Sequence, residues 1–219
     1  MGITFKNMYN DPPKDGVSKG NVPAIAASVK GDKTAFYKCA FKGVQDTLFD
    51  QSGRHYFYKC YIQGEIDFIF GNGQSIYEKC VINLVGGPDG PQGLGGYITA
   101  QARNSENDTS GFVFKYCTIE GVGKVFLGRA YRAYSRVIFT DSYLSPSIDP
   151  QGWSAWDYSG HEGNITFVEE GCRGAGANKS KRVPWLKHMG PNELIKFKSQ
   201  SFIDRDGWIP KQPITNKDI

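Results

Sequence analysis

Residues 35–43 read AFYKCAFKG, and residues 56–64 read YFYKCYIQG. Further copies follow at 75–83 (SIYEKCVIN), 112–121 (FVFKYCTIEG) and 137–145 (VIFTDSYLS), where Ser142 stands at the cysteine position. An earlier copy is expected at 2–10 (GITFKNMYN), with Asn7 at that position. The clearest period is about 20 residues, and repeats of this length are typical of a solenoid.

The repeated units favour strands over helices. They alternate Phe, Tyr, Ile and Val with polar residues, and no helical pattern separates them. The leucine-rich repeat signature is absent. We therefore predict an all-β parallel β-helix, one domain spanning 1–219. Residues 190–219 are expected to pack on it as a helix (191–198, capped by Asn192) and a tail.

The cysteines of successive coils should form a ladder inside the solenoid. There are five, Cys39, Cys60, Cys80, Cys117 and Cys172, with no Cys-x-x-Cys pair among them. Disulfides stay open as an alternative, but we favour buried free thiols that act as small apolar groups. No metal site is expected from this pattern.

Two aspartates share one place in neighbouring coils. Asp46 follows Cys39 by seven residues, and Asp67, within GEIDFIFGNG (64–73), follows Cys60 by seven. Two adjacent carboxylates do not both ionise freely, so one should hold a proton while the other stays charged. That division suits a general acid beside a nucleophile or base. The alternative to a catalytic pair is two solvated residues at strand ends that the repeat alone brings into alignment.

A basic residue follows a third apolar strand. Arg129 comes directly after Gly128 in VFLGRAY (125–131). On the same face, its guanidinium could keep a carboxylate ionised through charge-assisted hydrogen bonds. The alternative is an ordinary surface arginine.

Six blocks resemble the pectinesterase family, the plant-type pectin methylesterases. In chain order they are GVQDTL (43–48), DFIFG (67–71), ITAQAR (98–103), LGRAY (127–131), GWSAW (152–156) and RVPW (182–185). The resemblance covers nearly the whole chain. It implies a right-handed, single-stranded parallel β-helix that hydrolyses methyl esters of galacturonan in pectin.

The resemblance also implies residue roles. Asp67 would be the nucleophile, Asp46 the general acid and then base, and Gln45 an oxyanion donor, with Arg129 orienting Asp67. No cofactor or metal is implied. The residues expected in the sugar groove are Phe70, Gln101, Tyr131, Trp153 and Trp156. Tyr131 and Trp153 have the best claim, because they follow the strand ends that carry the site.

Three departures from the family pattern are visible. Pro23, in PAIAA (23–27), stands where the family has a second oxyanion glutamine, and proline has neither a side-chain amide nor a backbone N–H. Ala130 and Tyr131 replace the usual Pro and Trp. The family's N-terminal coils are missing, so the chain is expected to start near the third coil. The alternative function is therefore a non-catalytic or impaired pectin-binding relative.

Charge and composition bound the partners. The net charge is +4 with no dominant basic run, which fits an acidic polysaccharide and argues against a nucleic-acid groove. No stretch is long enough to span a membrane, and no signal peptide is recognised. Three Asn-x-Ser/Thr sequons, at Asn107, Asn164 and Asn178, favour secretion to the cell wall. We expect a monomer, and a proteinaceous pectinesterase inhibitor as a possible partner.

Other hydrolases fit less well. The three histidines, His55, His161 and His188, lie in no nucleophile-elbow context, which disfavours a Ser-His-Asp esterase. A pectate lyase would need a calcium-binding carboxylate cluster, and a polygalacturonase would need acids spaced for glycosidic cleavage. Neither accounts for the Gln-Asp, Asp and Arg blocks together.

Overall fold

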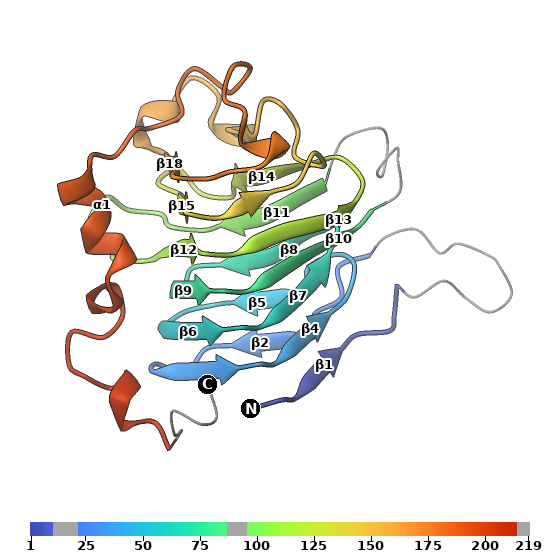
Figure 1. The fold of residues 1–219 in the computed structure, drawn as a ribbon, viewed down its shortest axis with the longest axis vertical. Helices are drawn as coiled ribbons and strands as arrows, with labels where there is room; N and C mark the ends of the chain where they lie inside the picture. Colours follow the sequence, from blue (N-terminus) through green and yellow to red (C-terminus); the bar gives the residue numbers. More distant parts are fainter. Residues whose placement is uncertain (11–21, 87–95, 214–219) are drawn as a thin grey trace, which may run out of the picture.

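A computed structural model describes residues 1–10, 22–86 and 96–213. In this part of the chain, three parallel six-stranded sheets, A, B and C, wind into a solenoid, and each coil adds one strand to each sheet (Figure 1). Sheet A contains β1 (Thr4–Lys6), β4 (Ala40–Lys42), β7 (Tyr61–Gly64), β10 (Val81–Val85), β13 (Thr118–Val122) and β16 (Tyr143–Leu144). The predicted parallel β-helix is confirmed.

The other two sheets follow in the same order along each coil. Sheet B contains β2 (Ala27–Val29), β5 (Leu48–Asp50), β8 (Ile66–Gly71), β11 (Gly96–Gln101), β14 (Val125–Ala130) and β17 (Trp153–Ser154). Sheet C contains β3 (Thr34–Tyr37), β6 (Arg54–Tyr58), β9 (Gln74–Glu78), β12 (Gly111–Lys115), β15 (Arg136–Thr140) and β18 (Thr166–Glu170). Short 3-10 turns lie after β17 and toward the C-terminus: η2 (Trp156–Tyr158), η3 (Glu162–Asn164), η4 (Ala175–Ala177), η5 (Gln200–Phe202) and η6 (Ile209–Lys211).

The corner between sheets C and A explains the cysteine ladder. The residue before the cysteine has a left-handed backbone in successive coils, with φ of 54° at Lys38, 51° at Lys59 and 55° at Lys79. This sharp bend turns the next side chain inward. Four cysteines, Cys39, Cys60, Cys80 and Cys117, are buried there, and all five of the chain are free thiols. The preference for thiols over disulfides is confirmed.

The register of sheet A confirms the residue predicted at the cysteine position in the last copy of the repeat, and it corrects the residue predicted there in the first copy. Ser142 holds the cysteine position, and its Oγ accepts a hydrogen bond from the backbone N–H of Cys117 at 3.0 Å. In the first coil, however, Thr4 pairs with Ala40, so Ile3 holds that position and not Asn7. The prediction aligned the aromatic alternation of 2–10 with a sheet C strand, whereas these residues form the sheet A strand β1.

Stacked aromatic rings fill the core along the axis. Phe36, Phe57, Tyr77, Phe114 and Phe139 follow one another from coil to coil, with ring centroids 5.2, 4.6, 4.5 and 4.4 Å apart and nearly parallel planes. The spacing matches the distance of about 4.8 Å between adjacent strands, because rings at equivalent positions stack when their strands pair in register.

The C-terminal segment covers the outer face of sheet C (Figure 1). Helix α1 (Pro191–Lys198) buries Leu194, and the segment after it buries Phe202 and Trp208. The helix begins at Pro191 and its N-cap position is Gly190, so the expected cap at Asn192 is wrong. Proline suits the first helical position, where its missing N–H costs no hydrogen bond. Residues 214–219 of the predicted tail lie outside the described residues.

No helix in the described ranges combines the length and the apolar character needed to cross a bilayer.

Candidate active site

A local irregularity in sheet B presents Asp67. Between β8 and β11, Tyr97 pairs with Ile66 and Thr99 with Ile69, so β8 carries one extra residue there. Asp67 lies in this bulge and has a φ of 48°. A bulge bends its strand and re-aims a side chain, which is why bulges are frequent beside functional sites.

Asp46 occupies the same position one coil earlier. Gln45 bridges Ile66 and Leu48 pairs with Ile69, which places Asp46 in register with Asp67. Its φ of 60° repeats the same left-handed backbone. The predicted adjacency of the two aspartates is therefore present, with both residues in an uncommon conformation for a residue other than glycine.

Arg129 reaches Asp67 from two coils further along the solenoid. Its Nε donates to Asp67 Oδ1 at 2.8 Å, and its Nη2 donates to Oδ2, so the pair is bidentate. On the intervening strand β11, Ala100 pairs with Arg129 on one side and with Phe70 of β8 on the other.

The two carboxylates differ in how they are held. Burial, the largest cause, and the neighbouring charge of Asp67 together raise the pKa of Asp46 to about 6, although Arg129 opposes both. Burial also raises the pKa of Asp67, but there the guanidinium opposes it through direct hydrogen bonds as well as charge. Because Arg129 bonds directly only to Asp67, the shared proton favours Asp46.

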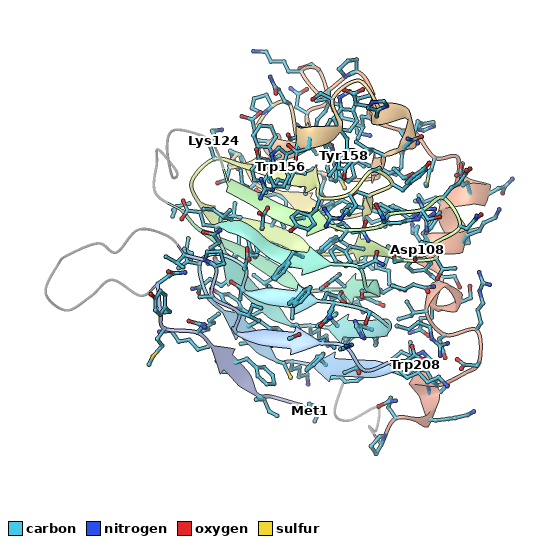
Figure 2. The ribbon with its side chains drawn as sticks, turned by 180° about the vertical axis from the view of Figure 1, so that it is seen from behind. Met1, Asp108, Lys124, Trp156, Tyr158 and Trp208 are labelled. Carbon is cyan, nitrogen blue, oxygen red and sulfur yellow. The ribbon has the colours of Figure 1, made fainter. Side chains whose placement is uncertain are left out.

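Aromatic rings clamp the guanidinium of Arg129. Its Cζ lies 3.2 Å from the ring centroid of Trp156 and 4.9 Å from that of Tyr97. Cations over aromatic faces are stabilised by the ring quadrupole. Tyr131 lies next to Trp156, with centroids 6.0 Å apart, and both rings are about 40% exposed (40% and 39%). Trp156 is labelled on the face shown in Figure 2, and its exposed ring is open to contact with a ligand there.

A second aromatic pair lies on the same two coils as the aspartates, three residues further along each. Phe70 is partly exposed and stacks on Phe49 of the preceding coil, with centroids 4.5 Å apart. Sequence reasoning missed Phe49 and Tyr97. Phe49 precedes Phe70 by the same offset that separates the two aspartates, so the repeat contained the signal for it. Tyr97 offered no comparable signal.

Two residues expected in the groove are buried instead. Gln101 has 0% exposure, and its Oε1 accepts hydrogen bonds from the backbone N–H groups of Arg103 and Arg136. Trp153 has 1% exposure, and its indole N–H donates to Glu169. Gln101 pairs with Ala130, the residue after Arg129, and Trp153 pairs with Gly128, the residue before it. Because successive side chains of a strand point to opposite faces, both lie on the inward face, opposite to Arg129. Their expected place in the groove is corrected.

The residues before Asp46 complete the local picture. Gln45 is half-buried, and its carbonyl accepts a hydrogen bond from the backbone N–H of Ala24 at 3.2 Å. Pro23 is exposed in the adjoining stretch of the preceding coil. Proline has no N–H group to donate. Gln45, directly before Asp46 in the chain, is therefore the candidate amide donor beside the aspartate pair.

His55 belongs to a buried polar cluster and cannot serve as the base of a serine hydrolase site. The Nδ1 of His55 lies 2.5 Å from Asp50 Oδ1, and its Nε2 lies 3.1 Å from the carbonyl oxygen of Gly31. Tyr77 donates to Asp50 Oδ2 at 2.6 Å. Ser75 pairs with His55, yet its Oγ makes no hydrogen bond. Asp50, His55, Tyr77 and Ser75 are all fully buried, so no ester can reach them.

No metal centre is visible in the described part of the chain, where no three His, Cys, Asp or Glu side chains gather at ligand distances.

Comparison with known proteins assigns the chain to a family. The pectinesterase family model matches residues 3–206. "Probable pectinesterase 55" and "Probable pectinesterase 29" of Arabidopsis thaliana are each 51% identical over 213 residues, which is 97% of this chain and 64% and 63% of those proteins. The chain thus spans less than two thirds of the length of these relatives.

Solved structures agree with this assignment. The pectin methylesterase from carrot has a TM-score of 0.84 at 29% identity, covering 97% of this chain and 67% of that one. The pectin methylesterase from Aspergillus niger has a TM-score of 0.77 at 28% identity, covering 94% and 62%. From its sequence and its fold alike, this chain belongs to the pectinesterase family.

Proposed function

We propose that the protein hydrolyses methyl esters of pectin, releasing methanol and leaving galacturonate carboxylates. The observation that carries the proposal is the in-register pair Asp46 and Asp67 with Arg129 bonded to Asp67. Burial raises the pKa of both carboxyl groups, but Arg129 favours the charged form of Asp67 through direct hydrogen bonds, so we assign the proton to Asp46 and the nucleophile to Asp67.

In the first half of the reaction, the carboxylate of Asp67 attacks the ester carbonyl carbon. The tetrahedral oxyanion accepts a hydrogen bond from the side-chain amide of Gln45. As the intermediate collapses, the bond to the methoxy oxygen breaks and Asp46 gives its proton to it, so methanol leaves. The products of this half are an acyl-enzyme anhydride on Asp67 and an ionised Asp46.

In the second half, Asp46 acts as a base. It takes a proton from a water molecule, whose oxygen attacks the acyl carbon of the anhydride. Collapse of this second intermediate expels the carboxylate of Asp67 and frees the galacturonate acid, which ionises in water. Asp46 ends protonated and Asp67 ends charged, as at the start.

Aromatic side chains support a saccharide ligand. Phe70, Tyr131 and Trp156 are partly or largely exposed on the side of sheet B that carries the aspartates, and we propose that they stack on sugar rings. Phe49 and Tyr97 would back this surface through their contacts with Phe70 and Arg129.

Methanol release from highly methylesterified pectin tests the proposal. Asp67→Asn should lower the rate by a factor of about 10³ or more, because the amide is not a nucleophile. Glu120→Gln, which neutralises an exposed carboxylate on sheet A, is the matched control and should keep full activity. A folded wild-type protein that binds pectin but releases no methanol would instead support the pectin-binding alternative.

We also propose that the protein acts outside the cell, in the plant cell wall, as a monomeric glycoprotein. The asparagines of all three sequons, Asn107, Asn164 and Asn178, are exposed, as glycan attachment requires. We propose glycans at Asn107 and Asn178, because Asn164 lines the basic pocket described below. A proteinaceous inhibitor is a proposed partner. Peptide mapping of protein secreted from plant cells checks the glycans, and light scattering checks the monomer.

A further inference from the structure

A basic pocket of about 360 Å³ lies where sheet B turns into sheet C. Its wall includes Arg103, just after β11, Arg136 at the start of β15, and Lys187. Asn164 and Thr166 complete the side next to β18. Asp108, in the loop between Arg103 and β12, marks this edge of the molecule in Figure 2. The pocket is separate from the aspartate pair.

The three cations of the basic pocket donate to backbone carbonyl groups, and the charges of Asp108, Glu106 and Glu193 act on them without a direct ion pair. Arg103 donates to the carbonyl oxygens of Asp108 and Tyr134 at 2.8 and 3.0 Å. Arg136 donates to the carbonyl of Ser110 at 3.0 Å, and Lys187 to that of Gly163 at 2.8 Å. Within the described residues none of the three forms a salt bridge. The one carboxylate lining the pocket belongs to Glu106, which is exposed.

Buried donors at this place lack acceptors. The Nε of Arg136 is buried without a hydrogen-bond partner, and so is the Nε2 of Gln101. The two residues are joined, because Gln101 Oε1 accepts from the backbone N–H of Arg136 at 2.8 Å. Buried donors are normally paired, so these two N–H groups leave hydrogen-bonding capacity unused at and behind the pocket wall, to which Arg136 belongs.

The crowding of positive charge in the basic pocket also favours a bound anion. Burial, the largest cause, and the charge of Arg103 together lower the pKa of Arg136 to about 10, although the charge of Asp108 opposes them. Burial and the charges of Arg103 and Arg136 also lower the pKa of Lys187. An anion in the basic pocket would relieve this repulsion and would accept charge-assisted hydrogen bonds.

We propose that the basic pocket binds one unesterified carboxylate of a partly de-esterified galacturonan, outside the reacting subsite. This rests on the proposed function, which makes such carboxylates. Ala100 pairs with Arg129, and Arg103 follows Ala100 by three residues, so the chain places the Cα of Arg103 within about 10 Å of that of Ala100, at ~3.3 Å per residue. A bound chain with free carboxylates would therefore gain a contact that a fully methylated chain lacks.

Binding of a short unesterified oligogalacturonate, measured by calorimetry at low salt, tests the proposal without requiring turnover. Arg136→Gln and Lys187→Met should each weaken binding by roughly tenfold or more, as expected for losing a hydrogen bond to a charged group. The matched controls Arg205→Gln and Lys30→Met change the same charges at exposed positions and should change binding less than twofold. The protein is made in cells that attach no N-glycans, because Asn164 begins a sequon.

The kinetic arm uses pectins of high and low methylesterification. The pocket variants should raise KM for the partly de-esterified pectin and leave KM for the nearly fully methylated one unchanged, an effect that general destabilisation would not produce. Pocket variants that bind the oligomer like their controls would overturn the proposal. It would also be overturned if inorganic phosphate occupied the pocket without displacing the oligomer. Loss of methanol release from wild type would refute the proposed function but leave the binding comparison intact.

Discussion

Replacing Arg129 with lysine keeps a positive charge beside Asp67 but removes the planar fork of donors. The wild-type pair contains two hydrogen bonds, one from Nε at 2.8 Å and one from Nη2. A lysine ammonium can replace one of them. A hydrogen bond to a charged group contributes about 1.5–3 kcal/mol, so we expect kcat/KM to fall roughly 10- to 150-fold.

The same substitution should shift the acid limb of the pH profile. Arg129 favours the ionised form of Asp67, so weakening this contact raises the pKa of that carboxyl. The nucleophile must be ionised, and the acid limb of kcat/KM therefore moves to higher pH. Arg129→Met, which also removes the charge, should move it further in the same direction.

Methanol release is measured from pH 4 to 9, with thermal unfolding recorded for each variant. Arg205→Lys is the control, since Arg205 is exposed and distant in sequence from the site. An Arg129→Lys enzyme with kcat/KM within twofold of wild type and an unchanged acid limb would refute the argued role of the bidentate pair.

Further predictions concern the acid and the core. Because the pKa of Asp46 is raised to about 6 and the acid must be protonated, kcat/KM should fall about tenfold per pH unit above that value, and a profile flat from pH 5 to 8 would contradict this. Tyr77→Phe removes a 2.6 Å hydrogen bond to the buried carboxylate of Asp50. It should lower the free energy of unfolding in urea by about 1.5–3 kcal/mol, and a loss below about 0.5 kcal/mol would show that the hydroxyl is dispensable. Gly64→Ala would place a Cβ 2.2 Å from that of Phe68 and should cost about 1–3 kcal/mol by the same measurement, whereas an unchanged denaturation midpoint would mean that the coil absorbs the methyl group.

Spacing along the chain predicted the coil register where the repeat was strong. The offset shared by the Cys39–Asp46 and Cys60–Asp67 pairs correctly placed the two aspartates next to each other, because pairing in a parallel solenoid keeps a constant offset between coils. The weak first copy was misaligned by the same method. Its strand is short, and local alternation alone does not distinguish a sheet A strand from a sheet C strand.

The direction of individual side chains was less predictable. Trp153 follows a strand end near the site and was expected in the groove, yet its ring fills the core over Gly128. A shift of one residue along a strand reverses the face on which a side chain lies. The bulge at Asp67 breaks this alternation. Its extra residue lets β8 present the carboxylate at the site, where strict alternation would not place it.

By itself, the sequence determined the solenoid, its cysteine ladder and the pairing of the two aspartates, because all three follow from a repeat that can be read along the chain. The family resemblance implied that Arg129 orients Asp67, and the structure gives the contact, across 62 residues. Only the tertiary structure decided that Tyr97 and Trp156 clamp the guanidinium and that a basic pocket gathers beside the sheet. These contacts depend on how far apart stacked coils place side chains of different lengths, and no local pattern in the sequence records that distance.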